Sequence, residues 1–231
     1  MDFDLKLMTI AFAIALSTLV GLVLWYWKKR RPCENKEAER LLQEYLQETL
    51  DSKEIGTFYE RYIGHLYELK NYHVNYHGAL NGFDDLGRDL IITGKREIII
   101  VQTKCWAKFK VISEKHIYQL YGSMVHYQRT HPCGEKTVKA RFYTTANFSS
   151  TAKEAARALD VELKTQELNR NYPLIKCNTN QRGQKIYHLP FDPFYDKIRI
   201  DISEDKFYVH TVKEAVARGF RRARQKKEDA A

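Results

Sequence analysis

The feature that most constrains the fold is an unbroken apolar run, Ile98-Ile99-Ile100-Val101, which ends in Gln102-Thr103-Lys104. Consecutive branched aliphatic residues are typical of a strand that is buried on both faces of a sheet. Few arrangements explain why a glutamine and a lysine finish so apolar a strand. We therefore expect the polar side chains at the end of this strand to belong to a functional site.

The residues before this run predict a hairpin that brings an acid to the same place. The turn Asp85-Leu-Gly-Arg-Asp89 precedes a strand at residues 89–92, a turn at residues 93–96 and a return strand at residues 97–104. Side chains alternate between the faces of a strand, so a two- or four-residue connection puts Asp89 on the face of Gln102 and Lys104. A three-residue connection would put them on opposite faces.

An acid, an amide and an ammonium at one edge of a sheet suit hydrolysis of a phosphodiester. That reaction needs a metal that polarises the phosphate and a positive group that absorbs developing charge. Mg²⁺ (or Mn²⁺) takes oxygen ligands, so a few side-chain oxygens are enough to hold it. We expect Asp89 to be the principal ligand, Gln102 to offer its amide oxygen and Lys104 to contact the phosphate. Glu60 or Asp85 could complete the metal shell or act as a base, and no organic cofactor is expected.

Glu60 lies on a predicted helix that begins after Asp51-Ser52 and runs to about Lys70. Apolar residues recur along this helix at helical spacing, but Glu60 lies outside their stripe. Gly56 and Gly64 flank Glu60, and each costs about 1 kcal/mol relative to alanine inside a helix. Small neighbours would let a strand, a metal or a nucleic-acid backbone approach Glu60. Alternatively, Glu60 is a solvated residue beside incidental glycines.

The other predicted elements place the hairpin in a larger sheet. Before the hairpin come a strand at residues 72–76 and a glycine-rich loop at residues 77–88. After it come a helix at residues 113–129, a strand at 138–145, a helix at 150–159 and a short strand at 161–163. The order α-β-β-β-α-β-α-β predicts an α/β fold with a mixed sheet flanked by helices.

Several of these motifs resemble a known family. They are Gly56-Thr-Phe-Tyr-Glu60, Asn71-Tyr72, Asp85-Leu-Gly-Arg-Asp89 and Gln102-Thr-Lys104, followed by Thr144-Thr-Ala-Asn-Phe-Ser-Ser-Thr-Ala152, Ala155-Ala156 and Val161-Glu-Leu163. In that order they resemble Mrr-like restriction endonucleases of the PD-(D/E)XK nuclease superfamily, over residues 53–165. The resemblance includes a variant active site in which glutamine replaces the second acid. It implies a restriction-endonuclease-like fold and Mg²⁺-dependent endonucleolytic cleavage of DNA.

The N-terminal segment is expected to be a membrane anchor. Residues 7–27 carry no charge and are long enough for a helix that crosses a bilayer. Trp25, Tyr26 and Trp27 lie together at one end, before a basic cluster at residues 28–31. This pattern predicts an uncleaved single-pass anchor at residues 1–31, ended by Pro32, with the C-terminal side in the cytoplasm. A cleaved signal peptide would need a basic start and a shorter apolar core.

Residues 32–52 are expected to form an amphipathic linker, with a helix at residues 34–50. This helix could pair with a second copy of itself and make a homodimer, or it could pack on the core or act as a stalk. Its apolar stripe is too short to favour a coiled coil.

Residues 166–231 are expected to form a small basic α+β module, with a terminal helix at residues 211–224. The formal net charge of the chain, +9, favours a polyanionic partner such as nucleic acid or an anionic lipid surface. The candidate nucleic-acid contacts are Lys108, Lys110, Arg221, Arg222 and Arg224. A solvated basic tail is the alternative for the last three.

These observations together predict a DNA endonuclease held by a single-pass anchor in the bacterial inner membrane, with its nuclease domain on the cytoplasmic side. A role in restricting foreign or modified DNA is a hypothesis. The alternative function is a non-catalytic DNA-binding module that tethers DNA to the membrane. The retained Asp89, Gln102 and Lys104 argue against that alternative.

Overall fold

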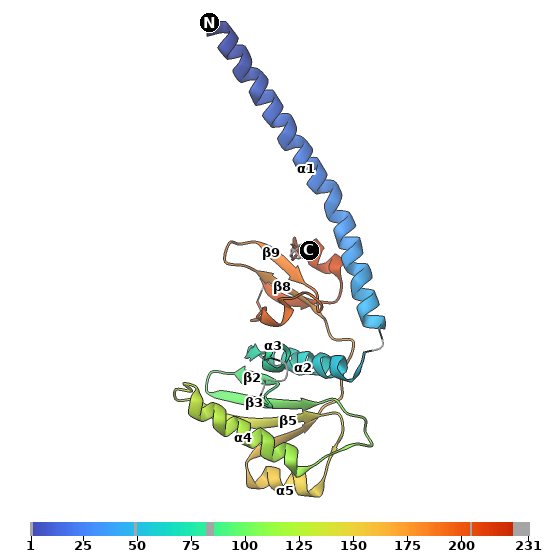
Figure 1. Cartoon of the computed structure of the whole chain (residues 1–231), viewed down its shortest axis with the longest axis vertical. Helices are drawn as coiled ribbons and strands as arrows, with labels where there is room; N and C mark the ends of the chain where they lie inside the picture. The colour runs from blue at the N-terminus through green and yellow to red at the C-terminus, as the bar shows by residue number, and fades with distance from the viewer. Residues whose placement is uncertain (1, 49, 82–85, 204, 224–231) are drawn as a thin grey trace, which may run out of the picture. The chain divides into compact units, whose positions relative to one another are not determined.

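The structure is a computed structural model that describes residues 2–48, 50–81, 86–203 and 205–223 (Figure 1). Within these ranges, the side chains of residues 2–14, 23–24 and 26–31 are not described. The chain divides into two units, Met1–Glu48 and Thr49–Ala231, and each is described by itself.

The first unit is one long helix, α1 (Asp2–Gln47), which continues through Pro32. The expectation that Pro32 ends a first helix, and that a separate helix covers residues 34–50, is therefore wrong. A proline removes one backbone hydrogen bond from a helix. The following residues are rich in good helix formers, and Arg40 pairs with Glu37 at 2.6 Å and also with Glu44. These local preferences offset the cost of the proline.

The predicted transmembrane anchor is contradicted. A membrane-spanning helix needs about 20 consecutive, mainly apolar residues. Among the described residues, no helix combines the length and the apolar character that crossing a bilayer requires. The expected transmembrane helix at residues 7–27, and the single-pass inner-membrane location that followed from it, are corrected accordingly.

The second unit is built around a five-stranded mixed sheet with the order β1-β2-β3-β5-β7. Its strands are β1 (His73–Asn75), β2 (Leu90–Thr93), β3 (Glu97–Lys104), β5 (Thr137–Thr144) and β7 (Val161–Thr165). The first three strands pair antiparallel, while β3, β5 and β7 run parallel. This arrangement confirms the predicted mixed α/β sheet. Helix α3 (His77–Asn81) lies where only a loop was expected.

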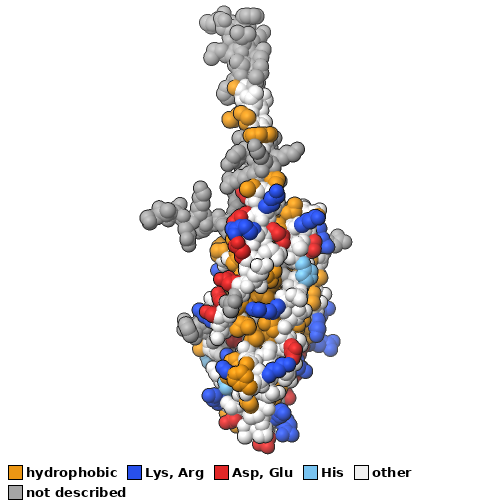
Figure 2. Space-filling model, turned by 90° about the vertical axis from the view of Figure 1, so that its right-hand side faces the viewer, with side chains coloured by type: hydrophobic (Ala, Val, Ile, Leu, Met, Phe, Trp, Pro, Cys, Tyr) orange, Lys and Arg blue, Asp and Glu red, His pale blue; other side chains and the backbone are white. Residues whose placement is uncertain are grey.

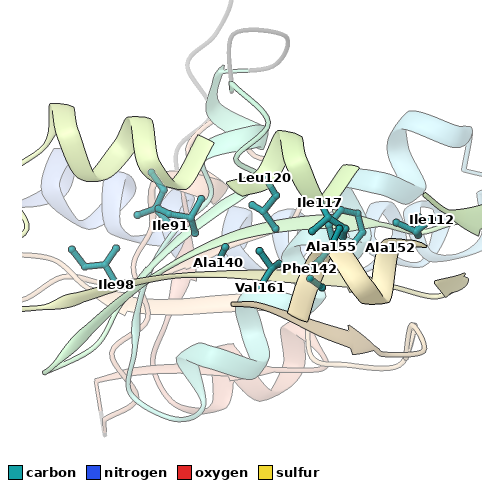
Figure 3. Close-up of a cluster of buried hydrophobic side chains, with 12 residues drawn as sticks. Ile91, Ile98, Ile112, Ile117, Leu120, Ala140, Phe142, Ala152, Ala155 and Val161 are labelled. Atoms are coloured by element: carbon teal, nitrogen blue, oxygen red, sulfur yellow. The ribbon is translucent and has the colours of Figure 1, made fainter. Parts of the chain in front are cut away.

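Helices cover both faces of this sheet (Figure 1). Helix α2 (Ser52–Glu68) lies on one face, and α4 (Glu114–Thr130) and α5 (Ser150–Ala158) lie on the other. A large apolar cluster fills much of the space between the sheet and α4 and α5 (Figure 3). It consists of Ile91, Ile98, Ile100, Ile112, Ile117, Leu120, Ala140, Phe142, Ala152, Ala155, Ala156 and Val161.

The start of α2 lies where the sequence predicts it, and a capping box fixes it. The side chain of Asp51 accepts hydrogen bonds from the backbone N–H groups of Lys53 and Glu54, and the Glu54 side chain accepts one from Asp51 N at 2.8 Å. These bonds satisfy backbone donors that the first turn of a helix leaves open. The cap therefore sets the register of α2 and with it the position of Glu60.

The C-terminal residues form a second sheet with the order β10-β8-β9-β11. Its strands are β8 (Ile175–Thr179), β9 (Lys185–His188), β10 (Lys206–Val209) and β11 (Arg221–Arg222). The expected terminal helix is shorter than predicted, because α6 covers only Val212–Ala217. Gly219, with a φ of +84°, then turns the chain, and β11 pairs with β9. A small third sheet joins β4 (Val111–Ile112) and β6 (Asn147–Phe148).

Candidate active site

The register of the β2–β3 hairpin decides whether a site can form. Thr93 pairs with Ile98 and Leu90 pairs with Val101, which leaves residues 94–97 as a four-residue connection. The N–H of Asp89, the residue before β2, donates to the carbonyl of Val101 at 2.9 Å. The predicted four-residue connection is confirmed. That Asp89 shares a face with Gln102 stays a prediction.

Asp89 is only 5% exposed, and its carboxylate is held by the neighbouring strand. Its Oδ2 atom accepts a hydrogen bond from Thr103 N at 2.5 Å and another from Thr103 Oγ1 at 3.0 Å. Strand β2 begins after Asp89, so the carboxylate takes the backbone donor that a longer β2 would have paired. Sequence analysis missed this role of Thr103. The only signal was a hydroxyl residue between the glutamine and the lysine.

Glu60 approaches the same place from α2. The backbone N–H of Gly78, on α3, donates to Asp89 O at 2.8 Å. A Cβ atom added to Gly78 would lie 3.0 Å from Glu60 Oε2 and 3.2 Å from Asp89 Cα. Any residue larger than glycine would therefore press on both acids. Gly78 is a second residue that sequence analysis missed, because the expected loop hid its close packing.

The glycines that flank Glu60 have different roles. A Cβ atom on Gly64 would lie 2.4 Å from the ring of Tyr76, so Gly64 is needed for close packing of that ring against α2. At Gly56 nothing lies within 4 Å of such an atom. The predicted close approach around Glu60 thus comes from Gly78 rather than from Gly56.

Gln102 and Lys104 lie on the face of the sheet that α4 covers, because Ile98 and Ile100 of the same strand pack there. Gln102 is 3% exposed, and among the described residues its Oε1 atom has no hydrogen-bond partner. Lys104 is half-buried at the end of β3, where its carbonyl accepts a hydrogen bond from Thr144 Oγ1 at 2.8 Å. Burial lowers the pKa of His116 on α4, and the charge of Lys104 acts in the same direction.

The donor set fits a hard divalent cation. Leaving a buried amide oxygen without a hydrogen bond costs about 1–3 kcal/mol, and a cation would remove that penalty. The carboxylates of Asp89 and Glu60 and the amide of Gln102 are all oxygen donors, which Mg²⁺ and Mn²⁺ prefer. Groups of three or more His, Cys, Asp or Glu that could hold a metal do not occur among the described residues. Asp85, the other proposed ligand, lies outside those residues.

The predicted nucleic-acid contacts fall in two places. Lys108 and Lys110 follow β3; Lys108 pairs with Glu167 at 2.6 Å, and Lys110 lies 5.5 Å from the centre of the Trp106 ring. Arg221 and Arg222 lie on β11, where Arg222 donates to the carboxylate of Asp192 at 2.6 Å. Arg224 lies outside the described residues.

Positive side chains do not gather into a single patch on the face drawn in Figure 2, where Lys and Arg alternate with Asp and Glu. A protein that binds nucleic acid mainly through its phosphates usually carries a basic stripe. Contacts with DNA are therefore expected from individual lysine and arginine side chains near the candidate site rather than from the net charge of the chain.

A comparison with protein families identifies a known domain in this part of the chain. Residues 52–168 match the family model Mrr_cat, described as "Restriction endonuclease". No curated protein matches the chain. Among solved structures, the chain is similar to "Crystal Structure of Protein of Unknown Function AF1548", at 14% identity and a TM-score of 0.38, over 47% of this chain and 57% of that one. It is also similar to "MspJI Restriction Endonuclease in Complex with 27-mer Oligonucleotide", at 16% identity and a TM-score of 0.32, over 48% of this chain and 25% of that one.

Proposed function

Since this chain belongs to the Mrr_cat restriction endonuclease family, we propose that it is a metal-dependent DNA endonuclease with its active site at Glu60, Asp89, Gln102 and Lys104. The single observation that carries the assignment is the buried Oε1 atom of Gln102, which lacks a partner among the described residues. The family model covers the elements that supply all four side chains. DNA is the proposed substrate, and restriction of foreign or modified DNA is the proposed biological use.

The proposed role of each residue follows from the chemistry of its side chain. Asp89, Gln102 and Glu60 would hold the cation, with Asp85 as a further ligand; Mg²⁺ or Mn²⁺, when bound, polarises the phosphate and makes a water more acidic. Thr103 keeps the Asp89 carboxylate in one orientation through two hydrogen bonds. Lys104 would contact the scissile phosphate and stabilise the negative charge that develops on its oxygens.

The two larger sheets of the second unit support a division of that unit into a catalytic domain and an appended module. We propose that residues 53–165 form the catalytic domain, because the five-stranded sheet ends with β7 at Thr165. Residues 166–231 would then be a separate module, because the second sheet begins at Ile175. Residues 1–52 lie before the catalytic domain, and dimerisation through them remains a proposal.

Cleavage of plasmid DNA by the purified full chain tests the proposed activity. We expect cleavage in Mg²⁺ and none in excess EDTA. Lys104→Ala should reduce the rate by about 10²–10³-fold, the usual effect of losing a group that stabilises transition-state charge. Asp89→Asn should reduce it at least as much.

Lys164→Ala is the matched control, because Lys164 lies on β7 of the same sheet and is about half exposed in its pair with Glu162. It should cleave at the wild-type rate. A wild-type chain that binds DNA without cutting it, with or without metal, would instead identify a non-catalytic DNA-binding module.

A further inference from the structure

A turn at residues 107–110, shortly after the proposed catalytic lysine in the chain, presents an exposed aromatic side chain. Phe109 is 84% exposed, more than any other large hydrophobic side chain in the described part of the chain. A single exposed apolar residue is ordinary on a protein surface. What distinguishes Phe109 is the support beneath it and the residues on either side.

The turn is held on both sides by hydrogen bonds. The N–H of Lys110 donates to the carbonyl of Ala107 at 2.9 Å, which closes the turn. The carbonyl of Trp106 accepts a hydrogen bond from Thr145 Oγ1 at 2.6 Å, and the carbonyl of Lys108 accepts one from Asn147 Nδ2 at 3.3 Å. Phe109 is therefore presented on a fixed backbone, which lowers the entropy lost when it binds something.

Charge and position indicate what the turn would bind. Lys108 and Lys110 flank the ring, and the Lys108 side chain is 79% exposed. Its ion pair with Glu167 is exposed to water and therefore weak, so a phosphate can replace the carboxylate. Phe109 follows Lys104 by five residues, which places it within about 18 Å of the proposed catalytic lysine. One duplex can therefore reach both.

We propose that Phe109 is a wedge that inserts between two base pairs of the DNA next to the phosphate that is cut, while Lys108 and Lys110 bind phosphates on either side. Apolar wedges in DNA-binding proteins unstack a base step and kink the duplex. The substrate class that follows is duplex DNA with a weakly stacked step near the cut, such as a pyrimidine–purine step or a mismatch. The proposal rests on the proposed function for the identity of the bound polymer.

DNA binding by the full chain carrying Asp89→Asn tests the wedge without depending on cleavage. The probe is a duplex with 2-aminopurine in a pyrimidine–purine step, whose fluorescence rises when its base unstacks. With Phe109 present, we expect a fluorescence gain on binding. Adding Phe109→Ala should remove that gain and weaken binding about tenfold, the effect of losing one stacked or inserted contact.

Phe194→Ala is the matched control, because Phe194 is 52% exposed and belongs to the C-terminal residues. Phe194→Ala should change neither the fluorescence gain nor the affinity for DNA. Wild-type affinity and fluorescence in the Phe109→Ala chain would overturn the wedge. So would a fall in molecular mass on Phe109→Ala, by light scattering, which would place the ring between copies of the chain.

The wedge and the endonuclease activity can be refuted independently of each other. A wild-type chain that cuts DNA while Phe109→Ala binds and cuts equally well would refute the wedge alone. A wild-type chain that never cuts DNA, but loses its fluorescence gain with Phe109→Ala, would refute the endonuclease and support the wedge.

Discussion

Helix α2 contributes an acid to each of two buried polar clusters, and the clusters differ in how their atoms are satisfied. One is the candidate site, with Glu60, Asp89 and Gln102. The other, called the Glu68 cluster, contains the buried residues Glu68, Tyr76 and Lys176 and the half-buried Tyr208. Both clusters lie in the second unit of the chain, so they can be compared directly.

Glu68 Oε2 and Lys176 Nζ find partners within the protein, whereas Glu68 Oε1, like Gln102 Oε1, is buried without a hydrogen-bond partner among the described residues. Glu68 Oε2 accepts hydrogen bonds from the hydroxyl of Tyr76 at 3.0 Å and from the hydroxyl of Tyr208. Lys176 Nζ donates to the carbonyls of Tyr195 at 3.3 Å and Ile198 at 3.1 Å, and lies 4.4 Å from the centre of the Tyr76 ring. Burial raises the pKa of Glu68 and lowers that of Lys176.

An unpartnered buried oxygen does not by itself separate the two clusters, because each contains one. Buried charges that hold a fold together are usually surrounded by donors and opposite charges from the same chain. Glu68 has two tyrosine hydroxyl donors and the charge of Lys176 acting on it, whereas Gln102 is a neutral amide whose Oε1 atom lacks a partner among the described residues. We infer that the Glu68 cluster fastens the second sheet to α2 and that the candidate site is kept for a ligand.

The largest expected effect is on stability, through Lys176→Met. Removing this ammonium leaves the Glu68 carboxylate buried without its opposite charge. Breaking a buried pair in this way costs about 3–5 kcal/mol in the free energy of unfolding. Urea unfolding measures it, with Lys104→Met as the matched change in the candidate site, which should cost less than about 1 kcal/mol. Equal losses in the two variants would remove the distinction between the clusters.

The next effect is a loss of stability in acid that comes from His65, which lies between the rings of Tyr172 and Tyr208. Burial lowers the pKa of His65 to about 4, below its unfolded value of 6.5. Between these values the unfolded chain binds more protons, so stability is present above pH 6.5 and is lost as the pH falls towards 4.

Replacing His65 by phenylalanine tests this dependence. The complete shift in the pKa of His65 corresponds to a change of roughly 3 kcal/mol in the free energy of unfolding. The raised pKa of Glu68 acts in the opposite direction, so the comparison must be made between His65→Phe and the wild type rather than on the wild type alone. We expect the variant to lose less stability between about pH 7 and about pH 5, measured by urea unfolding, because it lacks the group that gains a proton on unfolding. Parallel pH curves would show that His65 does not carry the effect.

The two regions also differ in how far the sequence predicts them. The hairpin at the candidate site could be predicted because the lengths of its strands and of one turn are set by neighbouring residues in the sequence. The Glu68 cluster could not, because Tyr208 lies 140 residues from Glu68 in the chain. No local pattern records a contact between elements so far apart.

The errors in prediction have the same origin. From neighbouring residues alone, Pro32 predicted the end of a helix, and the residues after Thr211 predicted a helix up to residue 224. Helix-forming neighbours instead carried α1 through the proline. Pairing of β11 with β9 drew Arg221 and Arg222 into a strand. Thr103 and Gly78 were missed because their importance depends on atoms of Asp89 that only the folded chain brings to them.

The smallest expected change in stability comes from Gln102→Leu, and it offers the most direct test of the site. Replacing a buried, unpartnered amide by an apolar side chain of similar size should leave the metal-free protein as stable as before or up to about 1 kcal/mol more stable. The matched control is Gln166→Leu, because Gln166 already donates a hydrogen bond to Glu167 O at 3.1 Å.

The deciding measurement is the binding of Mn²⁺ to the full chain, followed by electron paramagnetic resonance, in the wild type and these two variants. Loss of a metal ligand should weaken binding at least about tenfold in Gln102→Leu. Gln166→Leu should bind Mn²⁺ like the wild type. Unchanged Mn²⁺ affinity in Gln102→Leu, together with a less stable protein, would show that Gln102 serves the fold and would contradict the metal site.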